Sequence, residues 1–243
     1  AAYGVVLVKT KGGKEGDLKI SYDGSVAVKM ATYTPDVLSS EWYARLSNEA
    51  ALNENPNTST LPYTDKEIQM FRDGSNPDMY PNTNWYDLVL KDEAVMTKHS
   101  VSFSGGNKVK YFTSLGYMYD GSTLQWGNNN KERYNFRLTN TFKLANNISL
   151  ESIIAYSRES QVKPSLIGSV LSASVPQPGL PSSSIDGRPY AWGNWKSPNW
   201  LAELGGDNKL KVSALNISEQ IKWNITKDLD AVVQLGYNTN LAI

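Results

Sequence analysis

Long runs of alternating apolar and polar residues constrain the fold of this chain more than any other feature. Between residues 133 and 144, apolar side chains occupy every second position with one exception. Successive side chains of a β-strand point to opposite faces, so this pattern predicts a strand with one apolar and one polar face. The predicted apolar face carries Tyr134, Phe136, Leu138, Phe142 and Leu144.

About seven strands of this kind are predicted, and many of them are 10 to 14 residues long. They cover residues 16–29, 94–106, 107–119, 133–144, 148–159, 213–225 and 229–238. Strands of globular proteins are mostly about 5 to 6 residues long. The predicted strands are therefore unusually long, and each has a whole face of Lys, Arg, Asn, Ser, Thr or Gln.

The connections between these strands alternate strictly between short and long. Tight turns are predicted at 104–108, 144–147 and 225–228, and long segments at 30–94, 121–129 and 161–207. Outer-membrane barrels have short turns on the periplasmic side and long loops on the outer side, whereas a β-sandwich has no reason to collect its long loops at one end. The pattern favours an all-β, antiparallel transmembrane β-barrel whose polar faces line a wet lumen.

The first long segment is predicted to contain helices. One begins near residue 40 with Ser39 or Ser40 as its N-cap. A second begins with Thr64 and Glu67, which have the spacing of a capping box, and stops at Gly74. A third, short helix is predicted within 84–92. These helices are insertions in an outer loop of the predicted barrel.

Composition excludes several classes of function. Lys+Arg and Asp+Glu are equal at 24 each, so a nucleic-acid partner, which needs a surplus of basic residues, is not expected. The absence of cysteine removes disulfides and thiolate metal sites. His99 is the only histidine, so a metal site or a catalytic triad built on imidazole is not expected, and we interpret it as a polar residue near a strand start.

The first residues raise the question of what larger protein this chain belongs to. The sequence opens on the apolar β-run Val5–Val8 inside AAYGVVLVKTKGG, and it has no initiator Met. Seven such strands begin and end in the same direction and leave an open edge, and a sheet of this kind cannot close with so many bare strand edges. We therefore expect further strands, and an upstream region, outside this sequence.

Several segments resemble SusC/RagA-type TonB-dependent outer-membrane transporters. The stretch GVVLVKTKGG resembles the last strand of that family's plug domain, and NPDMYPNTNWYDLVL (76–90) its first extracellular loop. Residues 99–122 and 132–144 are similar to its second to fourth barrel strands. Tyr3 stands where the family usually has Asn. The resemblance implies that residues 1–12 are the C-terminal plug strand and that 13–243 are the N-terminal portion of a large barrel.

The resemblance also implies a function and partners. Such proteins import oligosaccharides or peptides through the outer membrane of Gram-negative bacteria, capped by a SusD-like surface lipoprotein and energised by TonB, which pulls on the plug. Contact with outer-membrane lipid is expected, and neither a cofactor nor an enzymatic activity is implied.

One loop segment is the sharpest candidate for a substrate or partner site. RPYAWGNWKSPNW carries Tyr190, Trp192, Trp195 and Trp200, whose flat faces can stack on sugar rings or anchor a partner protein. The same aromatic rings can instead pack the loop against its own barrel. The sequence leaves both readings open.

Charged and aromatic strand residues have predicted places as well. Arg133, Arg137 and Lys143 are expected to face the lumen, where they could contact the plug or an anionic substrate, or serve only as solvated structural charges. Tyr117, Tyr119 and Trp223 are expected near strand ends on the lipid face, as members of an aromatic girdle.

Two other classes of protein remain as alternatives. A soluble β-domain could hold glycans through the aromatic loop, and a carbohydrate-active β-sandwich enzyme would need two carboxyls held across a cleft. The acid pairs in the sequence, Asp36 with Glu41 and Asp73 with Asp78, fall in loops or helix starts. The segment 73–78 has oxygen ligands for Ca²⁺ but lacks the EF-hand spacing, so no metal site is predicted. A lipid-facing apolar band would distinguish the barrel from both alternatives.

Overall fold

A single antiparallel sheet forms most of the computed structural model, which describes residues 4, 11–172, 177–192 and 194–243. Seven long strands follow one another in chain order across the sheet. They are β1 (Gly16–Lys29), β2 (Ala94–Gly106), β3 (Val109–Gly121), β4 (Asn130–Ala145), β5 (Ile148–Pro164), β8 (Asp207–Asn224) and β9 (Asp230–Ala242). The predicted all-β meander is confirmed. The plug strand predicted at 1–12 lies almost entirely outside the described residues and stays a prediction.

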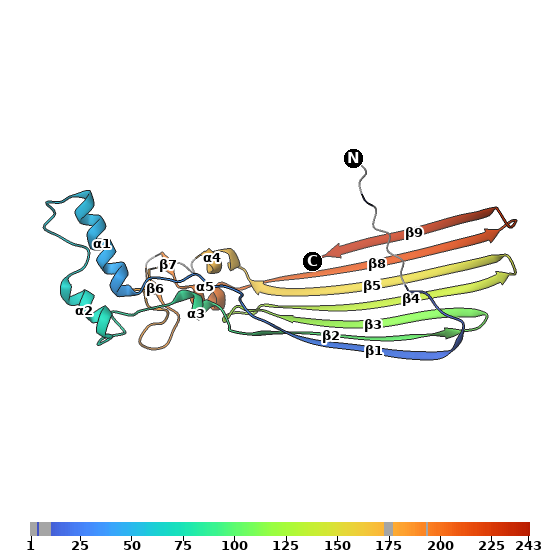
Figure 1. Ribbon diagram of the computed structural model, residues 1–243, viewed down its shortest axis with the longest axis horizontal. Helices are drawn as coiled ribbons and strands as arrows, with labels where there is room; N and C mark the ends of the chain where they lie inside the picture. The colour runs from blue at the N-terminus through green and yellow to red at the C-terminus, as the bar shows by residue number, and fades with distance from the viewer. Residues whose placement is uncertain (1–3, 5–10, 173–176, 193) are drawn as a thin grey trace.

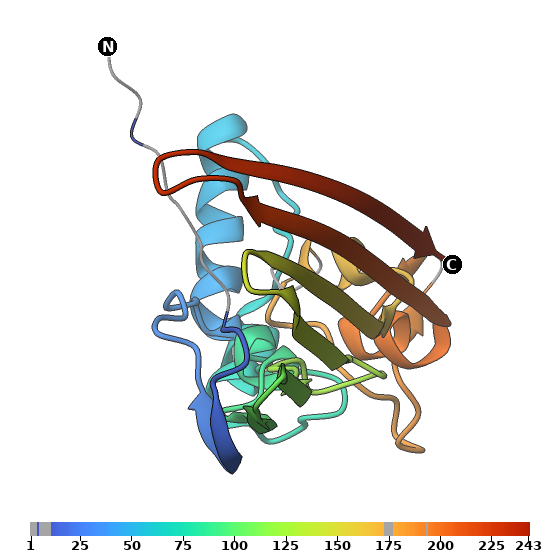
Figure 2. The same cartoon turned by 90° about the vertical axis from the view of Figure 1, so that its right-hand side faces the viewer.

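The strands are longer than the alternation predicted. Strand β5 continues to Pro164 and β8 begins at Asp207, so both extend into the predicted long segment 161–207. Alternation is weak there because Lys209 and Lys211 occupy positions where the pattern requires apolar side chains. Figure 2 views the molecule from the end that holds the short turns, and the strands run in one layer from the blue β1 to the red β9.

All long connections leave the sheet at one end. They contain α1 (Ser40–Glu54), α2 (Asp65–Asp73), α3 (Trp85–Val89), α4 (Ile167–Ser172), β6 (Ala191–Trp192), β7 (Trp195–Lys196) and α5 (Pro198–Leu204). Figure 1 shows these elements gathered beyond one end of the strands, opposite the tight turns. None of the described helices combines the length and the apolar character needed to cross a membrane.

The helix ends form where the sequence predicts them. The Ser39 side chain accepts a hydrogen bond from Trp42 N at the start of α1. Thr64 and Glu67 form both bonds of a capping box at the start of α2, and Gly74 ends that helix with a left-handed φ of 62°. Such a φ is costly for residues with a side chain, which explains the glycine. The short helix predicted within 84–92 is α3.

The sheet has one apolar and one polar face, and within the described residues neither is covered by a second layer. Residues paired across antiparallel strands face the same side, and one such row joins Tyr22, Val101, Leu115, Phe136 and Tyr156. Many apolar side chains on this face are exposed to solvent; the exposed fraction is 63% for Ile20 and 72% for Leu235. Among the described residues with buried apolar side chains, only Ala94 and Pro164 lie in the long strands, each at the strand end nearest the long connections. The predicted exposed apolar band is confirmed, and a soluble sandwich core is not what these strands form.

One row of polar side chains interrupts the apolar face. Asn140, Ser152 and Glu219 are directly paired neighbours on β4, β5 and β8. The Ser152 hydroxyl donates a hydrogen bond of 2.6 Å to Glu219 Oε1. Along β8 the carboxylate lies between Ile217 and Ile221 on the same face. The alternating pattern predicted the apolar residues of this face but did not predict Glu219 among them.

We expect Glu219→Leu to stabilise the complete protein in a lipid bilayer, because a carboxylate facing hydrocarbon costs free energy. The expected gain is on the order of 1 kcal/mol, below the cost of a basic residue at the bilayer midplane. Equilibrium unfolding of the complete protein in lipid vesicles measures it. Glu151→Leu, on the polar face of β5, is the matched control and should give no gain. A loss of stability in Glu219→Leu would show that this face does not meet hydrocarbon.

Candidate functional site

The outer loops pack against one another around a small core of their own. This loop assembly comprises the first loop (30–93), the second (122–129) and the third (165–206). Its buried core is formed by one or two side chains from each loop: Val89, Leu124, Val170 and Ala202. Leu90 and Leu124 form an isolated bridge, and Gln125 N donates to Val89 O at 2.8 Å. The loop assembly is thus the compact part of the described chain.

The first and third loops are joined by buried polar contacts. Thr83 N donates to Pro178 O, and the Thr83 hydroxyl donates to Leu180 O, both at 2.8 Å. Trp85 is 2% exposed and its indole Nε1 donates to Gln177 O at 3.2 Å. These bonds satisfy backbone carbonyls of the third loop. These hydrogen bonds hold α3 against the third loop. Segment 76–90, which resembles an extracellular loop of SusC/RagA-type transporters, therefore positions the aromatic loop (188–200).

The aromatic loop residues occupy different surroundings. Tyr190 and Trp195 are half-buried and their ring centroids are 6.0 Å apart. Trp195 also meets Trp85 edge-on, at 6.0 Å. Lys196 Nζ lies 5.3 Å from the Trp200 ring centroid, within cation–π range. Trp192 pairs with Trp195 in the β6–β7 hairpin, but its side chain lies outside the described structure. The structure thus gives Trp195 packing partners within the loops, and the predicted ligand or partner role of this group stays a prediction.

Sequence reasoning missed the elements that hold the aromatic loop. The β6–β7 hairpin and α5 were not predicted. A signal for α5 is present, because Ser197 accepts from Trp200 N as N-cap and Pro198 follows in the first turn. Serine followed by proline is a typical helix start. The two-residue strands of the hairpin are too short to give any periodic signal.

The helical hairpin of the first loop is held by an ion-pair cluster. Arg72 on α2 donates to Glu41 Oε1 on α1 through Nε and Nη2, at 2.9 and 2.6 Å, and Arg45 donates to the same oxygen at 2.9 Å. The bonds from Arg72, supported by Arg45, lower the pKa of the Glu41 carboxyl below its ordinary value. This acid therefore has a structural partner on each helix.

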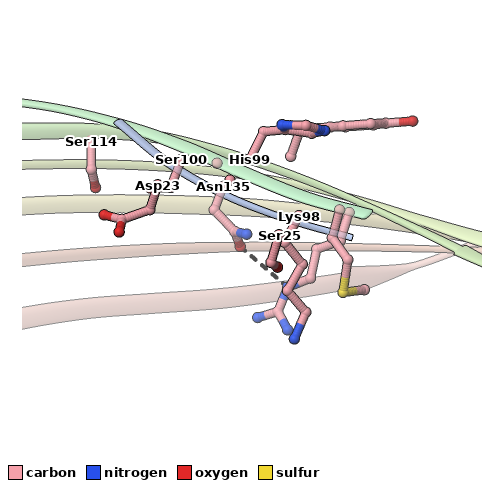
Figure 3. Close-up of a pocket in the computed structure, with 12 residues that line it drawn as sticks. Asp23, Ser25, Lys98, His99, Ser100, Ser114 and Asn135 are labelled. Carbon is pink, nitrogen blue, oxygen red and sulfur yellow. Dashed lines mark hydrogen bonds between the residues drawn. The ribbon is translucent and has the colours of Figure 1, made fainter. Parts of the chain in front are cut away.

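The polar face of the sheet contains a shallow hollow near its outer half. It has a volume of about 620 Å³ and is lined mainly by side chains of the first four strands. Asp23, Lys98, Arg133 and Asn135 supply its charged and polar groups, and Arg133 Nε donates to Asn135 Oδ1 at 3.2 Å. Figure 3 shows Asp23 and Asn135 on one side of the sheet and His99 on the other.

The three predicted lumen-facing cations share the polar face of β4 but do not form one site. Arg137 lies four residues from Arg133, and Lys143 lies beside the tight turns, in a second hollow with Lys108 and Lys110. Ten residues of strand separate Arg133 from Lys143, which is about 33 Å. The polar face therefore carries positive charge along its whole length. Contact of these side chains with a plug or substrate stays a prediction.

His99 lies on the apolar face, within β2 rather than at its first residue. It is paired with Gly24 and Tyr117, and its Nδ1 is 2.7 Å from the Tyr22 hydroxyl. The hydrogen bond explains how the ring is tolerated on this face.

Among the described residues no group of three potential metal ligands is present. In segment 73–78, whose sequence has oxygen ligands for Ca²⁺, Asp73 Oδ1 accepts a hydrogen bond from Ser75 N of the same loop.

Tyrosines mark the outer limit of the apolar band, and their positions reveal the tilt of the strands. Tyr119 on β3 is paired with Glu132, two residues beyond Tyr134 on β4. Continuing through Tyr156 on β5 to Tyr237 on β9, the limit moves six residues in four strand-to-strand steps. That shift, about 20 Å along the strands for about 19 Å across them, corresponds to a tilt of about 45°. Strands of outer-membrane barrels have this inclination.

Comparison with known proteins agrees with this geometry. No family model matches the chain. It is 32% identical to the TonB-dependent receptor SusC of Bacteroides thetaiotaomicron over 131 residues, which are 53% of this chain and 11% of that protein. It is 27% identical to the TonB-dependent receptor P26 of Formosa agariphila over 160 residues, which are 64% of this chain and 14% of that protein. The chain thus spans a small part of the relatives that it matches.

Solved structures extend the likeness over almost the whole fold. The structure of the RagAB peptide importer in its closed-closed state covers 95% of this chain and 29% of its own, with a TM-score of 0.67 and 15% identity. The structure of the RagAB peptide transporter covers 94% of this chain and 29% of its own, with a TM-score of 0.68 and 16% identity. The chain thus resembles SusC/RagA-type proteins in sequence and in fold. Its strands match outer-membrane barrel strands, and the sheet described here is not closed.

The ion-pair cluster of the first loop gives a testable contact. We expect Glu41→Gln to loosen α2 because it removes the charge that joins Arg72 and Arg45. Backbone amides of α2 should exchange with deuterium a few-fold faster at pH 7 in the complete protein. Since the folded pKa is lowered, the contact is present above the unfolded pKa of about 4.3 and is lost as pH falls through the folded value. Glu49→Gln, exposed on the same helix, should leave exchange unchanged, and equal rates in both variants would contradict this role.

Proposed function

We propose that this chain forms part of a TonB-dependent importer that carries oligosaccharides or peptides across the outer membrane. The observation that carries the proposal is a tilted sheet with an exposed apolar face and an exposed polar face, and no core beneath either in the described part of the chain. Such a sheet is stable where hydrocarbon meets one face and a wet lumen the other. The relatives are named as receptors and importers, not as enzymes, which supports a function without covalent chemistry.

The polar face and the loops support the proposed class of cargo. The hollow of Figure 3 presents carboxylate, ammonium, guanidinium and amide groups, and the loop assembly adds half-buried aromatic rings. Hydroxyl-rich sugars and peptide backbones are both recognised by hydrogen bonds and by stacking on aromatic rings. The name RagAB peptide importer indicates peptides as the cargo of that protein. For this chain we propose either oligosaccharides or peptides.

A SusD-like lipoprotein would dock on the loop assembly from outside, and TonB would act on the plug from the periplasm. The loop assembly lies entirely beyond the outer ends of the strands (Figure 1), where a surface partner has access. It exposes Trp42 and Leu46, four residues apart on one face of α1, and Leu38 just before that helix. Exposed aromatic and aliphatic side chains in one stripe are typical of protein contacts.

The barrel itself is tested by charges placed on adjacent residues of β4. In the complete protein, we expect Phe136→Arg to reduce the amount folded in the outer membrane, because its side chain faces lipid; the cost is about 2–4 kcal/mol at the midplane. Asn135→Arg, one residue away on the polar face, should insert normally. Heat-modifiable mobility of the membrane fraction measures both. Normal insertion of Phe136→Arg, or a folded water-soluble protein, would overturn the membrane assignment.

The aromatic loop is tested separately from the barrel. Trp195→Ala should make the loops more sensitive to protease, because this ring packs on Trp85 and Tyr190. Trp200→Ala should instead lower substrate uptake or lipoprotein co-purification while protease resistance is kept. Both are measured in cells that carry the complete transporter. Normal uptake and docking in Trp200→Ala would leave loop packing as the role of these rings.

A further inference from the structure

The basic residues of the seven long strands are distributed very unevenly between the two faces. Strand pairing places ten of them on the polar face: Lys19, Lys29, Lys98, Lys110, Lys131, Arg133, Arg137, Lys143, Lys163 and Lys222. In these described strands only three lie on the apolar face: Arg158, Lys209 and Lys211. The three exceptions are neighbours, which makes the apolar face positive at one place.

The register puts the three cations in one compact group. Arg158 on β5 is paired with Ser213, and Ser160 is paired with Lys211. Diagonal neighbours in an antiparallel pair have Cα atoms about 7–8 Å apart, so the Arg158 and Lys211 side chains can contact the same small group. Lys209 is the next residue of β8 on this face. We call Arg158, Lys209 and Lys211 the basic cluster.

The basic cluster lies just outside the tyrosine limit of the apolar band. Tyr156 ends the band on β5, and Arg158 is the next residue outward on the same face. Lys211 and Lys209 follow toward the end of the sheet that holds the loop assembly. In a membrane this height is the headgroup layer of the outer leaflet, because aromatic girdles mark the interface.

The cluster is open and is surrounded by hydroxyl groups. All three cations are exposed, and within the described chain none of them has an ion pair. The Tyr156 hydroxyl is 3.5 Å from Ser213 Oγ, beside Arg158. Hydroxyls and a guanidinium side by side can bind sugar and phosphate oxygens together.

Two acids share this face near the cluster and reduce its charge only in part. Glu132 on β4 is paired with Ser160, so it lies diagonally from Arg158 and one strand further from Lys211. Asp207, at the start of β8, accepts a hydrogen bond from Asn128 of the second loop at 2.8 Å. With three basic groups against two acids, the site keeps net positive charge.

We propose that the basic cluster binds a phosphate group of the phosphorylated glycolipid in the outer leaflet. The chemistry fits because arginine and lysine on a lipid-facing surface at headgroup height meet lipid phosphates, whereas cargo passes on the opposite face. The Ser160 and Ser213 hydroxyls contact the sugar to which the phosphate is attached. The proposal depends on the apolar face meeting lipid and is independent of which cargo is carried.

The experiment measures lipid binding by the complete transporter after delipidation in detergent. Lipid A in mixed micelles is titrated while the thermal unfolding midpoint is followed; phosphatidylcholine and inorganic phosphate are titrated in parallel. We expect lipid A to raise the midpoint of the wild type, and the double variant Arg158→Gln/Lys211→Gln to bind it at least ten-fold more weakly. Phosphatidylcholine and millimolar inorganic phosphate should leave the midpoint unchanged.

Two further variants keep the result interpretable. Lys98→Gln/Lys163→Gln removes two basic residues from the polar face and should bind lipid A as the wild type does. Arg158→Lys keeps the charge and should retain most of the affinity, which separates charge from a folding defect. Equal affinity in the wild type and the Arg158→Gln/Lys211→Gln variant would overturn the proposal, as would an equal loss in the polar-face variant. Stabilisation by inorganic phosphate alone would show an anion site without lipid recognition and would also overturn it.

Discussion

A sheet with two unlike faces and no second layer is the constraint on which the rest of the structure depends. The inner strands are paired with a neighbour on both sides, and such backbone pairing is the condition for crossing hydrocarbon. The apolar side chains cannot be buried within the described chain, as the exposure of Leu235 at the β9 edge illustrates. Their burial must come from lipid, and this requirement explains the long strands, the tilt and the tyrosine limit together.

The loop assembly is stabilised by a core of its own, unlike the sheet. It buries Val89, Val170 and Trp85 almost completely and joins three segments that are far apart in the sequence. Thr83 donates two hydrogen bonds to carbonyls of the third loop within this assembly. A water-exposed unit of this kind needs its own core, whereas the strands do not. The division explains why partner and substrate contacts are proposed for the loops, and lipid contacts for the strands.

Polar residues on the apolar face are informative because each one opposes the dominant pattern. His99 is accommodated by the Tyr22 hydroxyl, and Glu219 by the Ser152 hydroxyl. Arg158 and Lys211 instead lie beyond the tyrosines, where water and headgroups are available. The height of a polar residue relative to the tyrosine limit therefore separates a tolerated exception from a candidate binding group. Sequence alternation alone treats all of them as defects in the pattern.

The sequence by itself determined the strands, the turns between them, the caps of α1 and α2, and the SusC/RagA likeness, because these depend on neighbours within a few residues. It also placed Arg133, Arg137 and Lys143 on one face, since the period of a strand is fixed. Only the tertiary structure decided that Trp85 supports Trp195, that Glu41 on α1 pairs with Arg72 on α2, and that Arg158 lies beside Lys211. Each of those contacts links residues that are tens of positions apart, and strand register and loop packing, not local periodicity, bring them together.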